Sequence, residues 1–318
     1  MSLSDEYKKI YDMHIRTDFM GEIAVYDKEE DVHFFRPLSH NCPAKCSGMC
    51  SHDCYKSLGE LMRRNMVFYC YGEAEVVKNF NNGLFCDLEK AVKLAYKRTP
   101  DRSPKMDGLP GEVLLDTIVQ SLNPDAYKMA VRTLFRQNKD KEEIKGYDLT
   151  YFTNDNGHIT LWLGQAKMGS KQYCRNGILH DLEEKYSDMY MADQIYFLAD
   201  KPAELTDEGA ELAEILNRIN VLNIDKSDRQ RADQLLDFLE KEKIDICIPC
   251  LMVYEKKEVY RDIAKLTNKI TSEKVWCKKH FAKYFKFSKI NPKLLFIIFP
   301  IEDIDKLRGD KGFYYGLR

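Results

Sequence analysis

Directly after position 111, apolar residues recur at the spacing of an α-helix. Four of them lie three or four residues apart: Leu115, Ile118, Val119 and Leu122. This spacing is typical of one buried helix face, and Pro110-Gly111 suits the start of such a helix while Asn123-Pro124 ends it. Glu112 falls toward the buried side of the same helix, where a carboxylate needs a partner. The pattern therefore predicts a helix with a buried acid in its first turn.

The pattern then changes to one typical of strands. Residues 147–153 (YDLTYFT) and 158–167 (HITLWLGQAK) are rich in β-formers, and Asn156-Gly157 is a strong tight-turn signal within the loop 154–157. We therefore expect a β-hairpin. Further elements are expected around it: an extra strand near 130–136, a helix with an apolar stripe over 178–189, and a strand over 194–198.

The remaining chain also mixes helices and strands. Its expected elements are helices near 208–219, 228–241 and 258–268, a strand over 244–254 interrupted by Pro249, and a last strand over 293–300. Five Pro and Gly residues within 98–111 mark a linker between an N-terminal segment, 1–97, and a larger block, 112–318. The order of elements predicts an α/β (α+β) architecture, a mixed sheet flanked by helices, with the N-terminal segment as an extension.

Composition narrows the class of protein. A chain of 318 residues with 44% hydrophobic and 31% charged residues is typical of a globular protein. The 49 basic and 51 acidic residues exclude a basic coat over the whole surface but not a local nucleic-acid site. The longest dense apolar run, 294–299, is too short to span a membrane, and the N-terminus lacks a signal-peptide core, so we expect a cytoplasmic protein with no membrane contact. Its 10 cysteines are then expected to be thiols or metal ligands.

Four polar residues are expected to converge where the hairpin meets the helix. Side chains alternate across a strand, so Gln165 and Lys167 point to one face. The turn places Asp148 opposite position 163, near Gln165, and Glu112 approaches the same end of the sheet. Oxygen ligands suit Mg²⁺ or Mn²⁺, which polarise a phosphoryl group, and a neighbouring lysine orients the attacking water. The cluster indicates metal-dependent phosphodiester hydrolysis.

The same residues resemble a known nuclease superfamily. Gly146-Tyr147-Asp148 followed by Gly164-Gln165-Ala166-Lys167, on a hairpin between two helices, resembles the PD-(D/E)xK superfamily, whose core is restriction-endonuclease-like. The helix that starts at Gly111-Glu112 resembles its leading helix. The resemblance implies that Glu112, Asp148, Gln165 and the Ala166 carbonyl hold Mg²⁺ or Mn²⁺. Lys167 would position or activate the attacking water.

A narrower resemblance covers roughly residues 60–305. The segments GEVLLDTIV, GYDLTYF and ITLWLGQAKMGSKQY, with the late apolar strand that ends in Pro300-Ile301, resemble the HamA family (DUF1837). That family implies the nuclease subunit of the Hachiman anti-phage system, a superfamily 2 helicase partner called HamB, and DNA that is degraded or nicked during phage infection.

Gln165 departs from the usual superfamily pattern, which has Glu or Asp at this position. An amide oxygen still binds a metal but carries no charge. Mrr-like branches of the superfamily carry Gln here and are regarded as active, so we favour a nuclease. A second hypothesis stays open: a catalytically degenerate subunit that binds DNA or regulates the helicase.

A separate constellation lies in the N-terminal segment. Cys42, Cys46, Cys50 and Cys54 recur every four residues and form a candidate Zn²⁺ site. Their even gaps match neither the usual zinc pairs nor common iron–sulfur runs, so reduced thiols and a regulatory disulfide stay open. A structural adaptor organised by this cluster is a third hypothesis. The other cysteines are expected to be small core residues: Cys70, Cys86, Cys174, Cys247, Cys250 and Cys277.

Two basic stretches are candidates for DNA contact. Seven lysines and no acid lie from Lys274 to Lys293, with aromatic residues interleaved. Lysines bind phosphates and exposed aromatics stack on bases, but an amphipathic helix with its aromatics in the core is an equal alternative. The expected nucleic-acid contacts are Lys278, Lys279 and Lys283, together with Lys171 and Arg175 just after Lys167.

Overall fold

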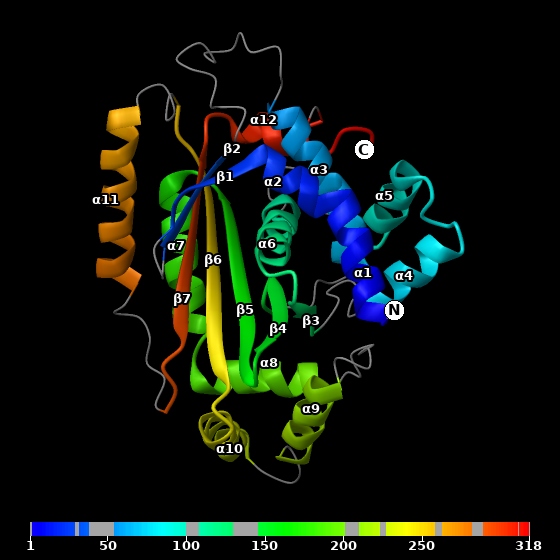
Figure 1. Cartoon of the computed structure of the whole chain (residues 1–318). Helices are drawn as coiled ribbons and strands as arrows, with labels where there is room; N and C mark the ends of the chain where they lie inside the picture. The colour runs from blue at the N-terminus through cyan, green and yellow to red at the C-terminus, as the bar shows by residue number, and fades with distance from the viewer. Residues whose placement is uncertain are drawn as a thin grey trace.

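Seven strands form one mixed sheet at the centre of the molecule (Figure 1). The computed structural model describes residues 2–28, 32–37, 54–99, 108–129, 146–200, 210–222, 227–257, 263–281, 289–310 and 312–317. In sheet order the strands are β1 (Ile23–Lys28), β2 (Val32–Pro37), β7 (Lys293–Ile301), β6 (Asp245–Glu255), β5 (His158–Gly169), β4 (Leu149–Asp155) and β3 (Tyr127–Lys128). The four middle strands, β2, β7, β6 and β5, run parallel, and the outer pairs are antiparallel. The predicted mixed sheet is confirmed.

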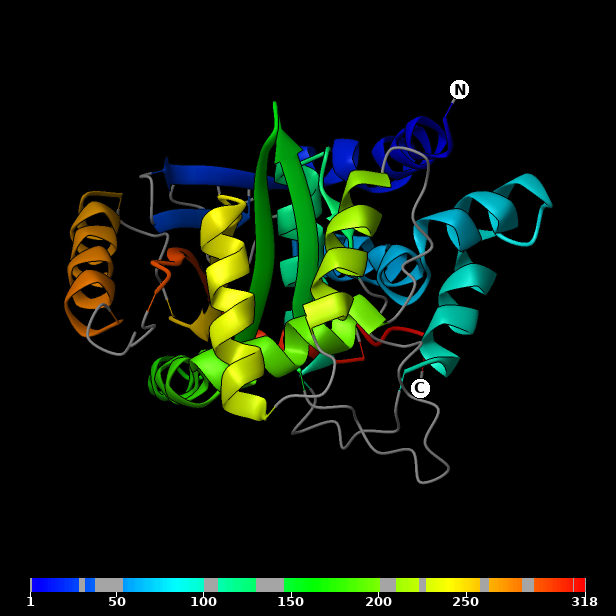
Figure 2. The same ribbon diagram turned by 90° about the horizontal axis from the view of Figure 1, so that it is seen from below.

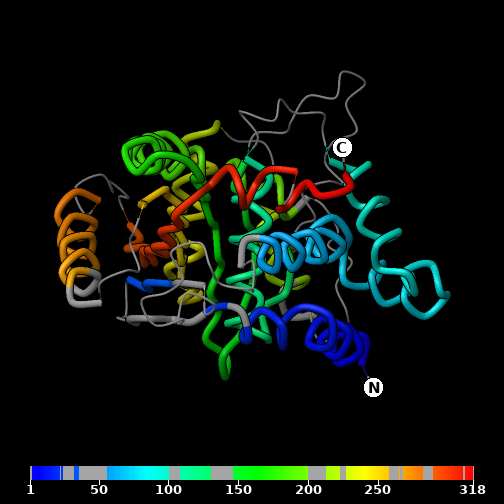
Figure 3. The backbone as a smooth tube through the Cα atoms, turned by 90° about the horizontal axis from the view of Figure 1, so that it is seen from above, coloured from blue at the N-terminus to red at the C-terminus, as the bar shows by residue number. Residues whose placement is uncertain are grey.

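Helices cover both faces of the sheet and give three layers. One face carries α1 (Leu3–Tyr11), the π-helix η1 (Asp12–Arg16), α2 (Thr17–Glu22), α3 (Cys54–Cys70), α4 (Glu73–Asn81), α5 (Leu88–Lys97), α6 (Leu109–Leu122) and α12 (Ile304–Arg308). The other carries α7 (Lys171–Glu184), α8 (Asp188–Asp200), α9 (Ala210–Leu222), α10 (Asp228–Lys241) and α11 (Ile263–Phe281). Figure 2 shows α9 and α10 beneath one end of the sheet, and Figure 3 shows α11 and α5 at opposite ends of the molecule.

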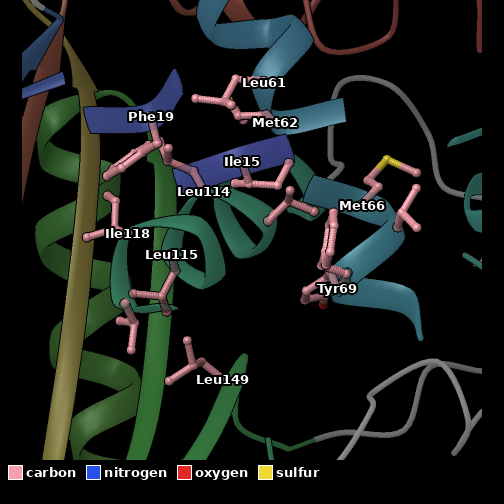
Figure 4. Close-up of a cluster of buried hydrophobic side chains, with 14 of the residues drawn as sticks. Ile15, Phe19, Leu61, Met62, Met66, Tyr69, Leu114, Leu115, Ile118 and Leu149 are labelled. Atoms are coloured by element: carbon pink, nitrogen blue, oxygen red, sulfur yellow. The ribbon is translucent and has the colours of Figure 1, made fainter. Parts of the chain in front are cut away.

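Helix α6 lies between the sheet and α3, and nearly all of its residues are therefore buried. Figure 4 shows three of them, Leu114, Leu115 and Ile118, among side chains from α2, α3 and β4. The predicted helix is confirmed: Pro110 lies in its first turn, and it ends directly before Asn123. Its apolar surface therefore fixes where the first turn, with Glu112, meets the sheet.

The predicted hairpin is also confirmed, with a tighter turn than expected. Asn156 and Gly157 have φ of 54° and 87°, as a two-residue hairpin turn of type I′ requires. Pairing consequently extends to Asp155 and His158, so the expected four-residue loop is a two-residue turn.

Strand β6 passes through Pro249 without ending. Pairing with β7 continues at Pro249, whereas the ladder to β5 resumes only at Cys250, because proline has no N–H to donate. Gly164 of β5 leaves room for the ring, since a Cβ on Gly164 would lie 3.0 Å from Pro249 Cγ. The proline therefore interrupts one ladder and not the strand.

The predicted strand over 194–198 is wrong, because these residues lie inside α8. Ala192, Ile195, Tyr196 and Ala199 are buried at helical spacing, and this packing overrides the β-rich composition. The helix expected over 178–189 is divided between α7 and α8, and Met189 is exposed. The helix expected over 258–268 corresponds to α11, which runs beyond it to Phe281, and residues 258–262 lie outside the described residues. The strand expected near 130–136 lies outside the described residues.

The two parts of the chain on either side of 98–111 share one sheet and one apolar cluster, because β2 pairs with β7. Arg98 and Thr99 follow α5, and α6 begins at Leu109. The division into domains at this segment stays a prediction. Within the described part of the chain, no helix has the length and apolar character needed to cross a membrane.

Candidate functional site

The hairpin brings Asp148, Gln165 and Lys167 to the face of the sheet that α7 covers. Leu149 pairs with Gly164, so Asp148 lies opposite Gln165, two positions from the predicted partner 163. A shift of two residues keeps the side chains on the predicted face. The Asp148 carboxylate also accepts a hydrogen bond of 2.8 Å from the Ala166 N–H, which fixes it beside β5.

Lys167 is held by an acid that the sequence analysis missed. Its Nζ lies 2.5 Å from Oδ2 of Asp181, which projects from α7 and is buried. Burial would lower the pKa of Lys167, but the Asp181 carboxylate, together with Asp148, raises it above its ordinary value. Lys167 is therefore a fixed ammonium group beside two carboxylates.

Lys185 extends this cluster to Gln165. Its Nζ lies 3.3 Å from Oδ1 of Asp181 and donates a 2.9 Å hydrogen bond to Oε1 of Gln165. Gln165 is fully buried, and its Nε2 has no hydrogen-bond partner. We call Asp148, Gln165, Lys167, Asp181 and Lys185 the hairpin cluster. The cluster connects β5 to α7 through ion pairs and a hydrogen bond.

The sequence does contain a signal for Asp181. Cys174, Ile178 and Leu182 form the buried stripe of α7, and Asp181 falls on the same stripe. A carboxylate in that position needs a cationic partner, and Lys167 on the facing strand supplies one. Gly177 belongs to the same arrangement, because a Cβ there would lie 3.0 Å from Cδ and Cε of Lys167.

Glu112 approaches β5 from the other side. It is buried as predicted, and its Oε2 accepts a 2.7 Å hydrogen bond from the Tyr69 hydroxyl of α3. The neighbouring Gly111 packs near the Cβ atoms of Ala166 and Met168, which face away from α7. Glu112 therefore reaches the same end of β5 as Lys167, but from the opposite layer.

The donor chemistry of the hairpin cluster fits a hard divalent cation. Among the described residues, no group of three or more His, Cys, Asp or Glu side chains is placed to hold a metal ion. Mg²⁺ needs fewer, because it keeps several waters and is held by one or two carboxylates plus phosphate oxygens. Asp148 supplies such a carboxylate, and Gln165 supplies an amide oxygen next to it that now accepts from Lys185.

The predicted DNA-contact residues divide into two groups. Lys171 and Arg175 both pair with buried Glu273 of α11, and the Arg175 guanidinium lies 3.8 Å from the Trp276 ring. Lys278 and Lys279 lie on exposed positions of α11, whereas Lys283 is outside the described residues. Of the interleaved aromatics, Phe281 is buried in the core, as the amphipathic-helix interpretation expects.

Three residues of the candidate zinc site, Cys42, Cys46 and Cys50, lie outside the described residues, and the fourth, Cys54, is the first residue of α3. The zinc site stays a prediction. Five of the six other cysteines are buried, as predicted: Cys70, Cys174, Cys247, Cys250 and Cys277. The prediction for Cys86 is wrong, because it is exposed. Burial raises the pKa of the Cys174 and Cys247 thiols to about 12, which makes both inert.

Fold and site together define a three-layer α/β protein with an ionic cluster between a hairpin strand and the helix that follows it. The sequence model of the HamA family matches residues 24–314, nearly the whole chain, and the chain belongs to that family. Membership implies a role in defence against phages. Neither the curated proteins nor the solved structures contain a match.

Proposed function

We propose that the chain is a Mg²⁺- or Mn²⁺-dependent DNA endonuclease of the PD-(D/E)xK type. The observation that carries the proposal is the meeting of Asp148, Gln165 and Lys167 on one face of the hairpin, with the Lys167 ammonium fixed by Asp181. Hydrolysis of a phosphodiester needs a carboxylate that binds the cation and, beside it, an ammonium group that stabilises the developing charge.

Each residue of the cluster has a distinct task. Asp148 and Gln165 offer oxygens to the cation, and the Ala166 carbonyl is a further candidate beside them on β5. The bound cation would supply charge neutralisation at the phosphate and a more acidic water. Lys167 orients the attacking water and stabilises the charge that develops on the phosphoryl oxygens. Asp181 positions Lys167 and does not touch the substrate.

The proposal extends to the context that the family suggests. The chain would act as the effector of an anti-phage complex, in the cytoplasm, with DNA as substrate and the HamB helicase as partner. The family match supports the defence role.

A direct test compares two aspartates at the two ends of β4: Asp148, which directly precedes the strand, and Asp155, its last residue. Asp148→Asn should abolish Mn²⁺ uptake in calorimetry and stop DNA cleavage, because it removes the carboxylate that is proposed to bind the cation. Asp155→Asn is the control, since Asp155 lies exposed at the distal end of β4. Equal Mn²⁺ uptake and equal cleavage by both variants would overturn the proposal.

A second candidate function rests on the contact between Lys185 and Gln165. An ammonium on the amide oxygen competes with a metal, which favours a degenerate subunit that binds DNA or regulates the helicase. In that case the wild-type chain would bind DNA but take up no Mn²⁺. Lys185→Met would sharpen the test, because it frees Oε1 of Gln165.

A further inference from the structure

A hollow of about 220 Å³ lies on the α7 side of the sheet, between the start of α7, the end of β6 and α11. Three lysines from these three elements line it: Lys171, Lys256 and Lys269. Asn268 and Ser272 of α11 add polar groups to the wall, and the Ser272 hydroxyl donates to the Asn268 carbonyl. The hollow is therefore lined by lysine side chains and by the polar residues Asn268 and Ser272.

Positive charge exceeds negative charge around this hollow. The acid in its wall, Glu273, is buried and already paired with both Lys171 and Arg175. Among the described residues, no acidic side chain pairs with Lys256 or Lys269. Burial, together with the cations Arg175 and Lys256, lowers the pKa of Lys171 to about 8. An anion in the hollow would relieve this repulsion.

The hollow adjoins the hairpin cluster. Tyr254, in its wall, pairs with Gly169 at the end of β5, two residues beyond Lys167. Along α7, Lys171 precedes Gly177 by six residues, which is about 9 Å of helix, and Gly177 contacts the Lys167 stem. Parallel strands β5 and β6 both end here, at the edge where α/β proteins commonly bind ligands.

We propose that the hollow formed by Lys171, Lys256 and Lys269 binds one backbone phosphate of the DNA strand whose reacting phosphodiester lies at Lys167. The inference rests on the proposed function and adds a binding site to it. A phosphate is the fitting anion, because it carries several acceptor oxygens and three lysines from different elements approach the hollow. The hollow thus sets which phosphodiester along a strand reaches the hairpin cluster.

The test measures DNA binding without cleavage. The full chain carrying Lys167→Ala is titrated with a fluorescent single-stranded oligonucleotide in EDTA, and the dissociation constant is followed by anisotropy over a series of salt concentrations. The double change Lys256→Ala/Lys269→Ala should weaken binding at every sequence and lower the slope of log Kd against log salt by about 0.7, one phosphate contact on single strands. Lys93→Ala is the control, on an exposed position of α5 at the far end of the molecule.

An unchanged salt slope in the double variant, or the same change in Lys93→Ala, would overturn the inference. So would a parent chain that binds no DNA, or displacement of all DNA by inorganic phosphate at matched ionic strength, which would mark a small-anion site. If only the nuclease proposal fails, the wild-type chain does not cleave DNA. The parent chain would still bind DNA with the expected salt dependence, and the double variant would still lower the slope of that dependence.

Discussion

The two faces of the sheet each bury an aspartate next to lysine, but the two clusters are built differently. On the α6 face, Asp116 accepts hydrogen bonds of 2.7 Å from the Tyr151 hydroxyl and 2.9 Å from Asn65, and lies 3.4 Å from Lys128 Nζ. On the α7 face, Asp181 lies between two ammonium groups, Lys167 and Lys185.

The two clusters differ in their exposure to solvent and in the number of charges that meet. The side chains of Lys128 and Asp116 are 4% and 5% exposed, and the Lys128 ammonium also donates to the Phe68 carbonyl. Lys167 and Lys185 are 19% and 24% exposed, and the two ammonium groups share one aspartate. A sealed ion pair serves the fold, whereas a partly exposed cluster of two carboxylates and two ammonium groups is accessible to a ligand.

The largest effect is expected from breaking the sealed cluster. Asp116→Ala leaves the buried Lys128 ammonium without its carboxylate and should lower the free energy of unfolding by about 3–5 kcal/mol. Chemical denaturation measures this, with exposed Asp155→Ala as the control. A loss below about 1 kcal/mol would show that the Asp116 cluster is not structural.

The next effect is expected from the open cluster. Asp181→Asn removes the charge that positions Lys167 and should lower the DNA cleavage rate on the order of 100-fold, with the Kd for DNA unchanged. Asp181→Glu, which keeps the charge, should restore part of the rate. A merely structural role would instead show as a loss of folded protein in both variants, with the rate per folded molecule intact.

A smaller effect is expected at Gly177. Gly177→Ala places a methyl group 3.0 Å from the Lys167 stem and should lower the cleavage rate about tenfold, while stability changes by no more than about 1 kcal/mol. Glu183→Ala, on an exposed position of α7, is the matched control. Equal rates for the two variants would show that the position of Lys167 is not critical.

The smallest effect concerns pH. Lys171 has a pKa of about 8, and a bound phosphate would raise it, so binding takes up a proton. DNA affinity should therefore fall between pH 7 and pH 9 by less than about tenfold, and Lys171→Gln should flatten this dependence. The charged or titratable groups that face Lys171 are Arg175, Lys256, Tyr254, Glu273 and Cys277. A wild-type affinity that rises with pH would contradict the assignment.

The sequence predicted the elements whose patterns are local. The α6 stripe, the Asn156-Gly157 turn and the last strand were found because helix spacing, turn chemistry and apolar runs each act over a few residues. The residues in α8 were misassigned, because their β-rich composition is outweighed by contacts that sequence spacing alone does not reveal.

The candidate site was predictable only on its strand side. Asp148, Gln165 and Lys167 follow from alternation and the hairpin register, and the two-residue error in that register preserved the face. Asp181 and Lys185 were missed, because the buried stripe of α7 includes Asp181 but does not reveal that its partner is Lys167 on β5. The basic hollow was also missed, since Lys171 lies far along the chain from Lys256 and Lys269.

The most direct test of the account is the rate of DNA cleavage by wild type and Lys167→Ala, with Mg²⁺ or Mn²⁺, alone and with the proposed helicase partner, on single-stranded, duplex and supercoiled DNA. The account predicts cleavage by wild type that EDTA abolishes and that Lys167→Ala lowers at least about 100-fold, while the exposed-lysine variant Lys93→Ala cleaves normally. Equal cleavage by wild type and Lys167→Ala, or none by either on any DNA, would contradict it.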